Sequence, residues 1–217
     1  MMWPSVDTCL VWPNGKAYLF FGDEYVRYDI AADRVDDGYP APVTGNWPGL
    51  WAPVGAGAVW PNGKAYFLRG NQYVRYDIAT DRVDDGYPAS IAGNWSGLSL
   101  SRVDAAVVWP NNKAYLFGHY DTGAPFGADG YVRYDIATDR QDPGYPTSVP
   151  ASWPGLSMPI DAAVVWPNGK AYFFHGNFYS RYDIAADRVD DGYPLPIAGN
   201  WPGVPVAQPA PPPPPLH

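Results

Sequence analysis

The chain has 217 residues, enough for one domain with a sizeable core, and a formal net charge of −8. This acidic balance disfavours nucleic acid and anionic membrane surfaces as partners, because phosphate contacts need clustered Lys and Arg. No apolar run approaches the roughly 18 residues of a membrane span, so we expect no membrane insertion. Glu24 is the only Glu among the 22 acidic residues. Since Asp is typical of turns and Glu of helices, the composition indicates an all-β chain with its negative charge on loops.

Four copies of one sequence unit fill the chain. The unit begins with W-P-N-[GN]-K-A-Y, which occurs at Trp12–Tyr18, Trp60–Tyr66, Trp109–Tyr115 and Trp166–Tyr172. The motifs Y-x-R-Y-D-I, G-Y-P and W-[PS]-G follow each copy in the same order. The steps between the first Trp residues are 48, 49 and 57 residues. A period of this size with strand-like content is typical of propellers, arrays and solenoids.

The last unit, residues 161–203, has the clearest pattern of elements. In chain order we expect an inner strand at 162–166, an Asn-Gly hairpin turn at 167–169, a second strand at 170–174, a third at 178–184, a short exposed fourth within 187–194 and a single helical turn around Trp201. The strands lack clean alternation, and runs such as Tyr172-Phe173-Phe174 are apolar on both sides. A blade covered by neighbours on both faces needs such runs.

Three or four antiparallel strands per unit, without a helical period, predict an all-β, four-bladed β-propeller with a short helical turn between blades. Radial closure covers both faces of each blade, whereas an open row leaves edges bare. We expect a single domain over residues 5–204, with blades at about 5–50, 51–100, 101–157 and 158–204. The third blade carries about eight extra residues within 119–129, at the turn between its second and third strands. Scaffolds of this kind often place function in such loops.

Both ends of the chain have a distinct composition. Met1–Pro4 is not a signal peptide, and Trp3-Pro4 resembles the end of a W-P-G motif, so we expect the chain to begin within a longer repeat array. Residues 205–217 include five consecutive prolines and indicate a stiff, exposed linker or tail. A ligand for proline-reading modules is the alternative. None of this assigns a cellular compartment.

The repeated motifs resemble the hemopexin-repeat family, in its bacterial or seed-albumin-like branch. The family's unit runs D-A-A on the innermost strand, then K-A-Y-x-F, a glycine turn, Y-x-R-Y-D and a G-Y-P…W-P-G close. Here Asp104-Ala105-Ala106 and Asp161-Ala162-Ala163 match D-A-A fully, Asp7-Thr8-Cys9 partly, and Gly55-Ala56-Gly57 only in shape. The resemblance covers residues 5 to about 204. It implies a four-bladed propeller with a narrow central channel, and non-enzymatic binding of haem, matrix proteins or polyamine.

The resemblance also implies a cation site in the channel. Backbone carbonyls of the residues that begin the inner strands would form one ring, namely Asp7, Gly55, Asp104 and Asp161, and a second ring would be Cys9, Gly57, Ala106 and Ala163. In the family such rings hold calcium or sodium, and hard cations prefer oxygen ligands. Gly55 keeps a carbonyl but removes one carboxylate and loosens the strand of its blade. A channel that holds only water or an anion is the alternative.

Arg and Asp recur at fixed places in each unit. Arg27, Arg75, Arg133 and Arg181 each stand two residues before Asp29, Asp77, Asp135 and Asp183. Because residues two apart share one face of a strand, we expect a repeated structural Arg–Asp pair between strands or blades. The clusters Asp36-Asp37, Asp84-Asp85 and Asp190-Asp191 lack the ordered spacing of a calcium loop. We expect them to form turns, and calcium binding at the rim is the alternative.

The chain has three histidines and one cysteine. His119 in the insertion and His175 after the second strand of the fourth unit are the candidates for haem ligation, and an ordinary surface pair is the alternative. His217 lies in the tail. Cys9 has no partner for a disulfide between the first and last blades, and we expect it to be a small buried side chain. No catalytic combination of nucleophile and base is recognisable, so we do not expect an enzyme.

Two functions fit this sequence. The first is a binding module for a small cationic ligand at the channel mouth or rim, with calcium first, then polyamine or haem. The second is a protein- or glycan-interaction domain of a larger extracellular or toxin-like protein, which uses the Asp-rich rim and the third-unit insertion. In either case we expect a monomer or a weak dimer.

Overall fold

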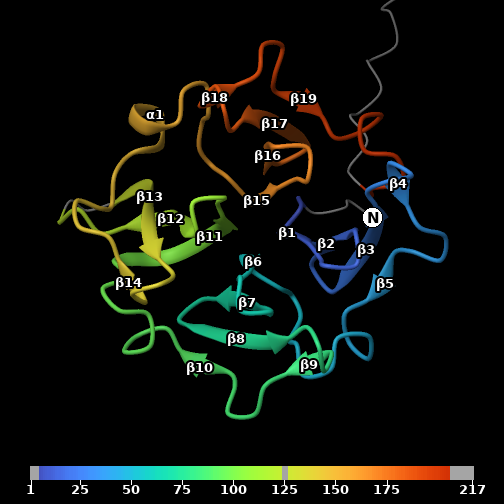
Figure 1. Ribbon diagram of the computed structural model, residues 1–217, viewed down its shortest axis with the longest axis horizontal. Helices are drawn as coiled ribbons and strands as arrows, with labels where there is room; N and C mark the ends of the chain where they lie inside the picture. The colour runs from blue at the N-terminus through green and yellow to red at the C-terminus, as the bar shows by residue number, and fades with distance from the viewer. Residues whose placement is uncertain (1–4, 124–126, 206–217) are drawn as a thin grey trace, which may run out of the picture.

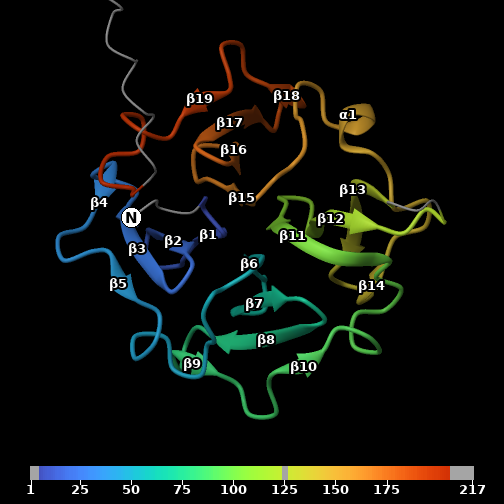
Figure 2. The same cartoon turned by 180° about the vertical axis from the view of Figure 1, so that it is seen from behind.

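The computed structural model describes residues 5–123 and 127–205 of the chain. Four antiparallel sheets stand around a central axis, and each runs from an inner strand near the axis to short strands at the rim (Figure 1). The view from behind has the same ring of four blades (Figure 2). The predicted all-β, four-bladed propeller is therefore confirmed.

Each blade has three main strands and two-residue strands outside them. The first blade consists of β1 (Thr8–Val11), β2 (Lys16–Phe21), β3 (Glu24–Asp29), β4 (Arg34–Val35) and β5 (Ala41–Pro42). The second consists of β6 (Gly57–Val59), β7 (Lys64–Arg69), β8 (Gln72–Asp77), β9 (Arg82–Val83) and β10 (Ala89–Ser90). The third consists of β11 (Leu100–Val108), β12 (Lys113–Tyr120), β13 (Ala128–Asp135), β14 (Arg140–Gln141) and the helix α1 (Val149–Ser152). The fourth consists of β15 (Ala162–Val165), β16 (Lys170–His175), β17 (Phe178–Asp183), β18 (Arg188–Val189) and β19 (Leu195–Pro196).

The main strands of the fourth blade agree with the predicted ranges to within one residue at each end. The expected short fourth strand within 187–194 is β18, and a further two-residue strand, β19, follows it; both pair with β17. The expected helical turn at Trp201 is present as a hydrogen-bonded turn that ends on this residue. The N–H of Trp201 donates to the carbonyl of Ile197, four residues earlier, and only in the third blade does this turn extend into a four-residue helix.

The third blade accommodates the inserted residues by lengthening a hairpin. Strands β12 and β13 are eight residues each, and they pair as far as Tyr120 and Ala128. In the first blade the corresponding strands are six residues long. The insertion therefore falls between second and third strands, as predicted. Residues 124–126 of the insertion lie outside the described residues.

The hydrophobic core lies between blades rather than within them. Its four clusters of buried residues each combine side chains from two adjacent blades. Leu19, Phe20 and Phe21 are consecutive and all buried, which confirms that both faces of a blade are covered. The strands therefore need apolar side chains on both faces, and the sequence shows no clean alternation.

The Trp of each W-[PS]-G motif links its own blade to the next one. The Trp47 indole lies 5.2 Å from the Tyr18 ring of its own blade and 5.2 Å from the Tyr76 ring of the second blade, measured between centroids. Each aromatic pair of this kind contributes about 0.5–1.5 kcal/mol beyond its buried area. In the same way Trp201 of the last blade lies 5.4 Å from Tyr28 of the first. The last blade is therefore packed on the first as the first is on the second.

A backbone hydrogen bond accompanies each of these contacts. The N–H of Val35 in the first blade donates to the carbonyl of Pro202, at 2.9 Å, and closes the ring. Equivalent bonds join Val83 to Pro48 and Val189 to Pro154, also at 2.9 Å. Cys9 is a free, buried cysteine, as predicted. Closure therefore depends on packing and hydrogen bonds.

The predictions for the two ends of the chain concern residues outside the described part of the structure. Trp3-Pro4 and the proline-rich residues 206–217 lie outside the described residues. No helix in the described part of the chain is long and apolar enough to cross a membrane.

The glycine of W-P-G allows this close approach between blades. Gly203 has a φ of +85°, and a Cβ on it would lie 2.8 Å from the Cβ of Val35. Gly97, its counterpart in the second blade, has a φ of +74° but more room, with Gln141 Cβ at 3.7 Å. A larger residue would therefore strain the backbone at both positions, but it would clash with a neighbouring side chain only at position 203.

We predict that Gly203→Ala destabilises the protein more than Gly97→Ala. Both changes place a Cβ at positive φ, at a cost of about 1 kcal/mol, and only the first also overpacks the ring closure, which adds about 1–3 kcal/mol. Urea unfolding followed by tryptophan fluorescence measures both free energies. Equal losses for the two variants would contradict the close packing at Val35.

Candidate functional site

The four inner strands surround a channel along the propeller axis. Strands β1, β6, β11 and β15 lie nearest the centre of the ring (Figure 1). One mouth of the channel is a cavity of about 290 Å³. Its lining includes all four residues that the sequence assigned to the first ring, Asp7, Gly55, Asp104 and Asp161. The fold therefore brings together residues that are about 50 residues apart in the chain.

The second predicted ring lies at a narrower part of the channel. A cavity of about 80 Å³ is lined by Cys9, Gly57, Ala106 and Ala163, together with the two residues that follow each of them. All four side chains are small or absent, so the backbone of the inner strands forms much of the wall. Burial raises the pKa of the Cys9 thiol, which is therefore protonated and is not a thiolate ligand.

The carboxylates at the wider mouth have structural partners. One Asp7 oxygen accepts the N–H of Gly22 at 2.5 Å, and one Asp161 oxygen accepts the N–H of Gly176 at 2.7 Å. Each of these Asp side chains therefore holds the turn between the second and third strands of its own blade. Asp104 instead pairs with Arg102 through two bonds of 2.6 and 3.0 Å. This partner, which the sequence analysis missed, belongs to the blade whose turn is replaced by the insertion.

The second blade departs from the others at the channel. A Cβ on Gly55 would lie 2.2 Å from the carbonyl oxygen of Leu68, so no larger residue fits there. Its inner strand β6 begins one position later in the unit than β1 and β15. Gly57 provides room for Thr8, whose hydroxyl lies 3.4 Å from the Gly57 carbonyl oxygen. Thr8 stands where the other units have Ala, and its pairing with Gly57 was not predicted.

The charged form of Asp7 is disfavoured at this mouth. Burial raises the pKa of Asp7 above its ordinary value of 3.8, and repulsion from Asp161 adds to the rise, although the Gly22 N–H opposes it. Among the described residues, no group of three or more His, Cys, Asp or Glu side chains is close enough to hold a metal ion. A cation on the axis would therefore take backbone carbonyls as ligands, with the carboxylates as neighbouring charges. Oxygen donors of this kind suit calcium and sodium.

The two haem candidates lie at the ends of second strands in adjacent blades. His119 on β12 pairs through Nδ1 with an Asp129 oxygen at 2.9 Å. His175 at the end of β16 stacks on Phe178, and burial lowers its pKa below 6.5, although the charge of Asp161 opposes the shift. His119 therefore has one ring nitrogen already engaged. Haem ligation stays a prediction.

A charged cluster recurs in all four blades. The expected repeated Arg–Asp pair is present, and the partner of Arg27 is Asp36 rather than Asp29 on its own strand. Lys16 Nζ lies 2.6 Å from Asp29, and Arg27 Nε lies 2.6 Å from Asp36. Lys16 also reaches Asp36 at 3.1 Å, so the Asp36 carboxylate is shared. The equivalent clusters are Lys64, Arg75, Asp77 and Asp84; Lys113, Arg133, Asp135 and Asp142; and Lys170, Arg181, Asp183 and Asp190.

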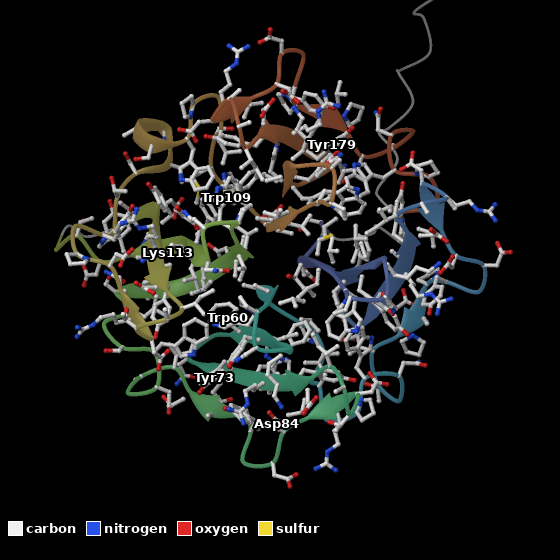
Figure 3. The ribbon with its side chains drawn as sticks, viewed as in Figure 1. Trp60, Tyr73, Asp84, Trp109, Lys113 and Tyr179 are labelled. Carbon is white, nitrogen blue, oxygen red and sulfur yellow. The ribbon has the colours of Figure 1, made fainter. Side chains whose placement is uncertain are left out.

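Strand register determines which Asp pairs with Lys16 and which with Arg27. Lys16 stands directly opposite Asp29 in the β2–β3 ladder, and directly opposite side chains are closer than residues two apart on one strand. Asp36 is brought to Arg27 by the bond from its own N–H to the Arg27 carbonyl. The first Asp of each Asp-Asp cluster is therefore an ion-pair partner as well as a turn residue. Lys113 and Asp84 mark this cluster in the third and second blades (Figure 3).

We predict a loss of stability below about pH 4 from this cluster. The hydrogen bond from Lys16 lowers the pKa of Asp29 from 3.8 to about 2, and the equivalent Lys residues do the same for Asp77, Asp135 and Asp183. Because the folded pKa lies below the unfolded one, this stabilisation is complete above the unfolded pKa and is lost as pH falls toward about 2. Urea unfolding as a function of pH measures it. A free energy of unfolding that stays constant through this window would contradict the ion pairs.

Comparison with known proteins agrees with this architecture. A family model described as Hemopexin matches residues 6–52, 57–99 and 160–206, more than half of the chain. The chain belongs to the hemopexin family. The predicted family is therefore confirmed. The matched residues do not include the third repeat, whose spacing the insertion alters.

The similar proteins of known sequence are much longer than the matched hemopexin segment. Matrix metalloproteinase-25 of Homo sapiens is 57% identical over 37 residues, which cover 17% of this chain and 7% of that protein. The Mus musculus protein of the same name is 54% identical over 37 residues, 17% of this chain and 6% of that protein. The shared part is thus less than one repeat unit.

Solved hemopexin-fold structures resemble nearly the whole propeller. A plant albumin from Cicer arietinum that shows hemagglutination has a TM-score of 0.74 and 21% identity, covering 90% of this chain and 95% of its own. A plant lectin with two metal-binding sites from the same species has a TM-score of 0.74 and 23% identity, covering 91% and 96%. The hemopexin fold protein CP4 from cow pea has a TM-score of 0.72 and 20% identity, covering 90% and 95%. At this identity the similarity establishes the fold.

Proposed function

We propose that this hemopexin-family propeller is a non-enzymatic binding module that holds a calcium or sodium ion in its central channel. The observation that carries the proposal is the convergence of Asp7, Gly55, Asp104 and Asp161 on one cavity at the channel mouth. Backbone carbonyls of these residues would provide oxygen ligands, and water would complete the coordination that calcium needs. The metal sites of the similar plant lectin support the idea that this fold accommodates metal.

Electrostatics at the mouth also favour a cation. Three carboxylates line the cavity, and Arg102 pairs with only one of them, Asp104. The raised pKa of Asp7, due to burial and then to Asp161, means that the site disfavours its own negative charge. A cation on the axis would stabilise both carboxylates. An anion in the same place would meet Asp7 and Asp161 at close range.

We predict that calcium binds this protein with one site per chain and raises its Tm. Isothermal titration of calcium into protein stripped with a chelator, in buffer without sodium, gives stoichiometry and affinity, and a parallel titration with sodium tests the second cation. A ligand that binds only the folded state raises stability by about 2.7 kcal/mol at a hundredfold excess over Kd. No binding heat and no change in Tm with either cation would contradict the proposal.

Matched variants locate the site. Replacing both Asp7→Asn and Asp161→Asn removes charge while retaining oxygen acceptors for Gly22 and Gly176, and should weaken calcium binding about tenfold. Asp36 belongs to a partly buried ion-pair cluster, so the control changes Asp37 and Asp85 to Asn, again two charges. Both side chains are exposed, and Asp85 pairs with Arg82 at the surface. If both double variants weaken calcium binding equally, calcium affinity depends on the net charge of the protein and not on these two carboxylates.

We also propose polyamine and haem as ligands of this binding module. Spermine would meet the carboxylates of the channel mouth and should therefore compete with calcium. Haemin would require His119 and His175, so its Soret shift should disappear in His119→Ala and His175→Ala proteins. A titration with each compound, read by calorimetry and absorbance, tests both ligands independently of the cation.

A further inference from the structure

Two cavities with aromatic walls lie between neighbouring blades, away from the channel. One, of about 290 Å³, lies between the second and third blades, and the other, of about 160 Å³, lies between the fourth and first. Neither shares a lining residue with the two channel cavities. A ligand in these cavities would therefore contact none of the residues that line the proposed cation site.

The same positions of the repeat line both cavities. One blade contributes the Trp of W-P-N, the Tyr of K-A-Y, the first Tyr and the Arg of Y-x-R-Y, the Tyr of G-Y-P, and the Asn and Trp that end the unit. The next blade contributes the second Tyr of Y-x-R-Y and the Asp of its D-R pair. Tyr73 and Tyr179, which occupy the same place in the two cavities, lie on opposite sides of the axis (Figure 3). Because rotation about the axis relates the units, both cavities open on the same face of the ring.

The walls present ring surfaces of half-buried and buried aromatic residues. In the larger cavity Trp60 and Trp95 meet edge to face with centroids 5.6 Å apart, and Tyr66 and Tyr73 are nearly parallel at 6.3 Å. Tyr87 closes the wall through an edge contact with Tyr73 at 5.3 Å. These contacts fix the rings before any ligand arrives. A rigid aromatic wall of this kind binds ligands at a low cost in conformational entropy.

Polar groups at defined positions interrupt this aromatic wall. The Arg75 guanidinium lies over the Tyr87 ring at 5.2 Å and uses Nε to bind Asp84, while a guanidinium carries five N–H donors in all. Asn94 is fixed by a 2.9 Å bond from its amide nitrogen to Ser90, and its side-chain oxygen is an additional acceptor. Asp139 from the neighbouring blade accepts the Tyr134 hydroxyl at 3.0 Å. Hydrogen-bond donors and acceptors therefore line the same cavity as the aromatic rings.

We infer that these interblade cavities bind the pyranose ring of a sugar. A pyranose presents C–H groups on its faces, which pack on the electron-rich faces of aromatic rings, and hydroxyls at its edge, which need both donors and acceptors. A cationic ligand would meet the guanidinium of Arg75, and a purely apolar one would leave the remaining acceptor positions of Asp139 and Asn94 without a new partner. Volumes below those of pockets for drug-sized ligands, about 300–1,000 Å³, suit a single sugar residue.

The arrangement of the cavities favours binding to surfaces that carry many sugars. Two sites on one face can engage two glycan ends at once, and linked binding events strengthen each other without new contacts. The sequence suggested a protein- or glycan-interaction domain that uses the Asp-rich rim and the third-unit insertion; this inference specifies sugar as the ligand and the blade junctions as the site, and it does not depend on the channel cation.

The test uses methyl glycosides of glucose, galactose, mannose, fucose and N-acetylglucosamine as probes. Saturation-transfer NMR detects which sugar contacts the protein, and tryptophan fluorescence gives Kd, since Trp60, Trp95, Trp166 and Trp201 line the cavities. We expect at least one glycoside to bind with a Kd of about 1 mM or tighter, in the presence or absence of chelator.

Variants decide whether binding occurs in these cavities. Tyr87→Ala with Tyr193→Ala should weaken binding at least about tenfold, a change of about 1.4 kcal/mol. Asn94→Ala with Asn200→Ala, at exposed positions, should weaken it without disturbing the core. The control Phe178→Ala removes an exposed aromatic ring outside both cavities and should leave Kd unchanged.

Three results would overturn the inference. Absence of saturation transfer to every glycoside would mean that the cavities are gaps in aromatic packing. Unchanged Kd in both double variants would place sugar binding elsewhere. Binding of tetramethylammonium in preference to all glycosides would show that the rings select a cation. None of these results bears on calcium in the channel, so the two proposals fail separately.

Discussion

The propeller depends on one repeated contact, the insertion of the W-[PS]-G tryptophan between its own blade and the next. Trp47, Trp95, Trp153 and Trp201 each pack against rings of both blades, and a hydrogen bond to the following carbonyl, at position 48, 96, 154 or 202, accompanies every contact. Because the contact recurs at the last interface, the ring closes without a disulfide, and the single cysteine is buried at the axis. A single blade in isolation would expose two apolar faces. It is stable as one of four blades in a closed ring, because its neighbours cover both faces.

Closure determines where binding can occur. It brings the starts of four inner strands to one axis and leaves a cavity there, the basis of the proposed cation site. It also places the aromatic residues that link the blades next to Arg, Asn and Asp side chains of the rim, where the interblade cavities form. Other charged side chains stabilise the scaffold: Lys16, Arg27, Asp29 and Asp36 neutralise each other in the first blade, and equivalent residues do so in the other three. The candidate binding surfaces are therefore the hub and the blade junctions.

The sequence predicted the fold well because repetition gives four readings of each element. Strand limits in the fourth blade, the site of the insertion and the burial of Cys9 all followed from motif and pattern. The convergence of the channel residues came from family resemblance. The repeated Arg–Asp pair was expected, but which Asp binds Arg27 depends on strand register, which sets Lys16 opposite Asp29 and leaves Asp36 for Arg27. Arg102 with Asp104, Thr8 with Gly57 and the interblade cavities involve contacts between residues or blades that no local pattern specifies.

Native-state hydrogen exchange tests the closed ring most directly. The amide of Val35 bonds to Pro202 across the junction between the first and last blades, whereas the amides of Val83 and Val189 make the same bond at junctions between consecutive blades. If packing closes the ring, all three amides exchange at similar rates, governed by global unfolding. Exchange of Val35 about a hundredfold faster than that of Val83 and Val189 would mean that the ring opens at this junction, and would contradict the account.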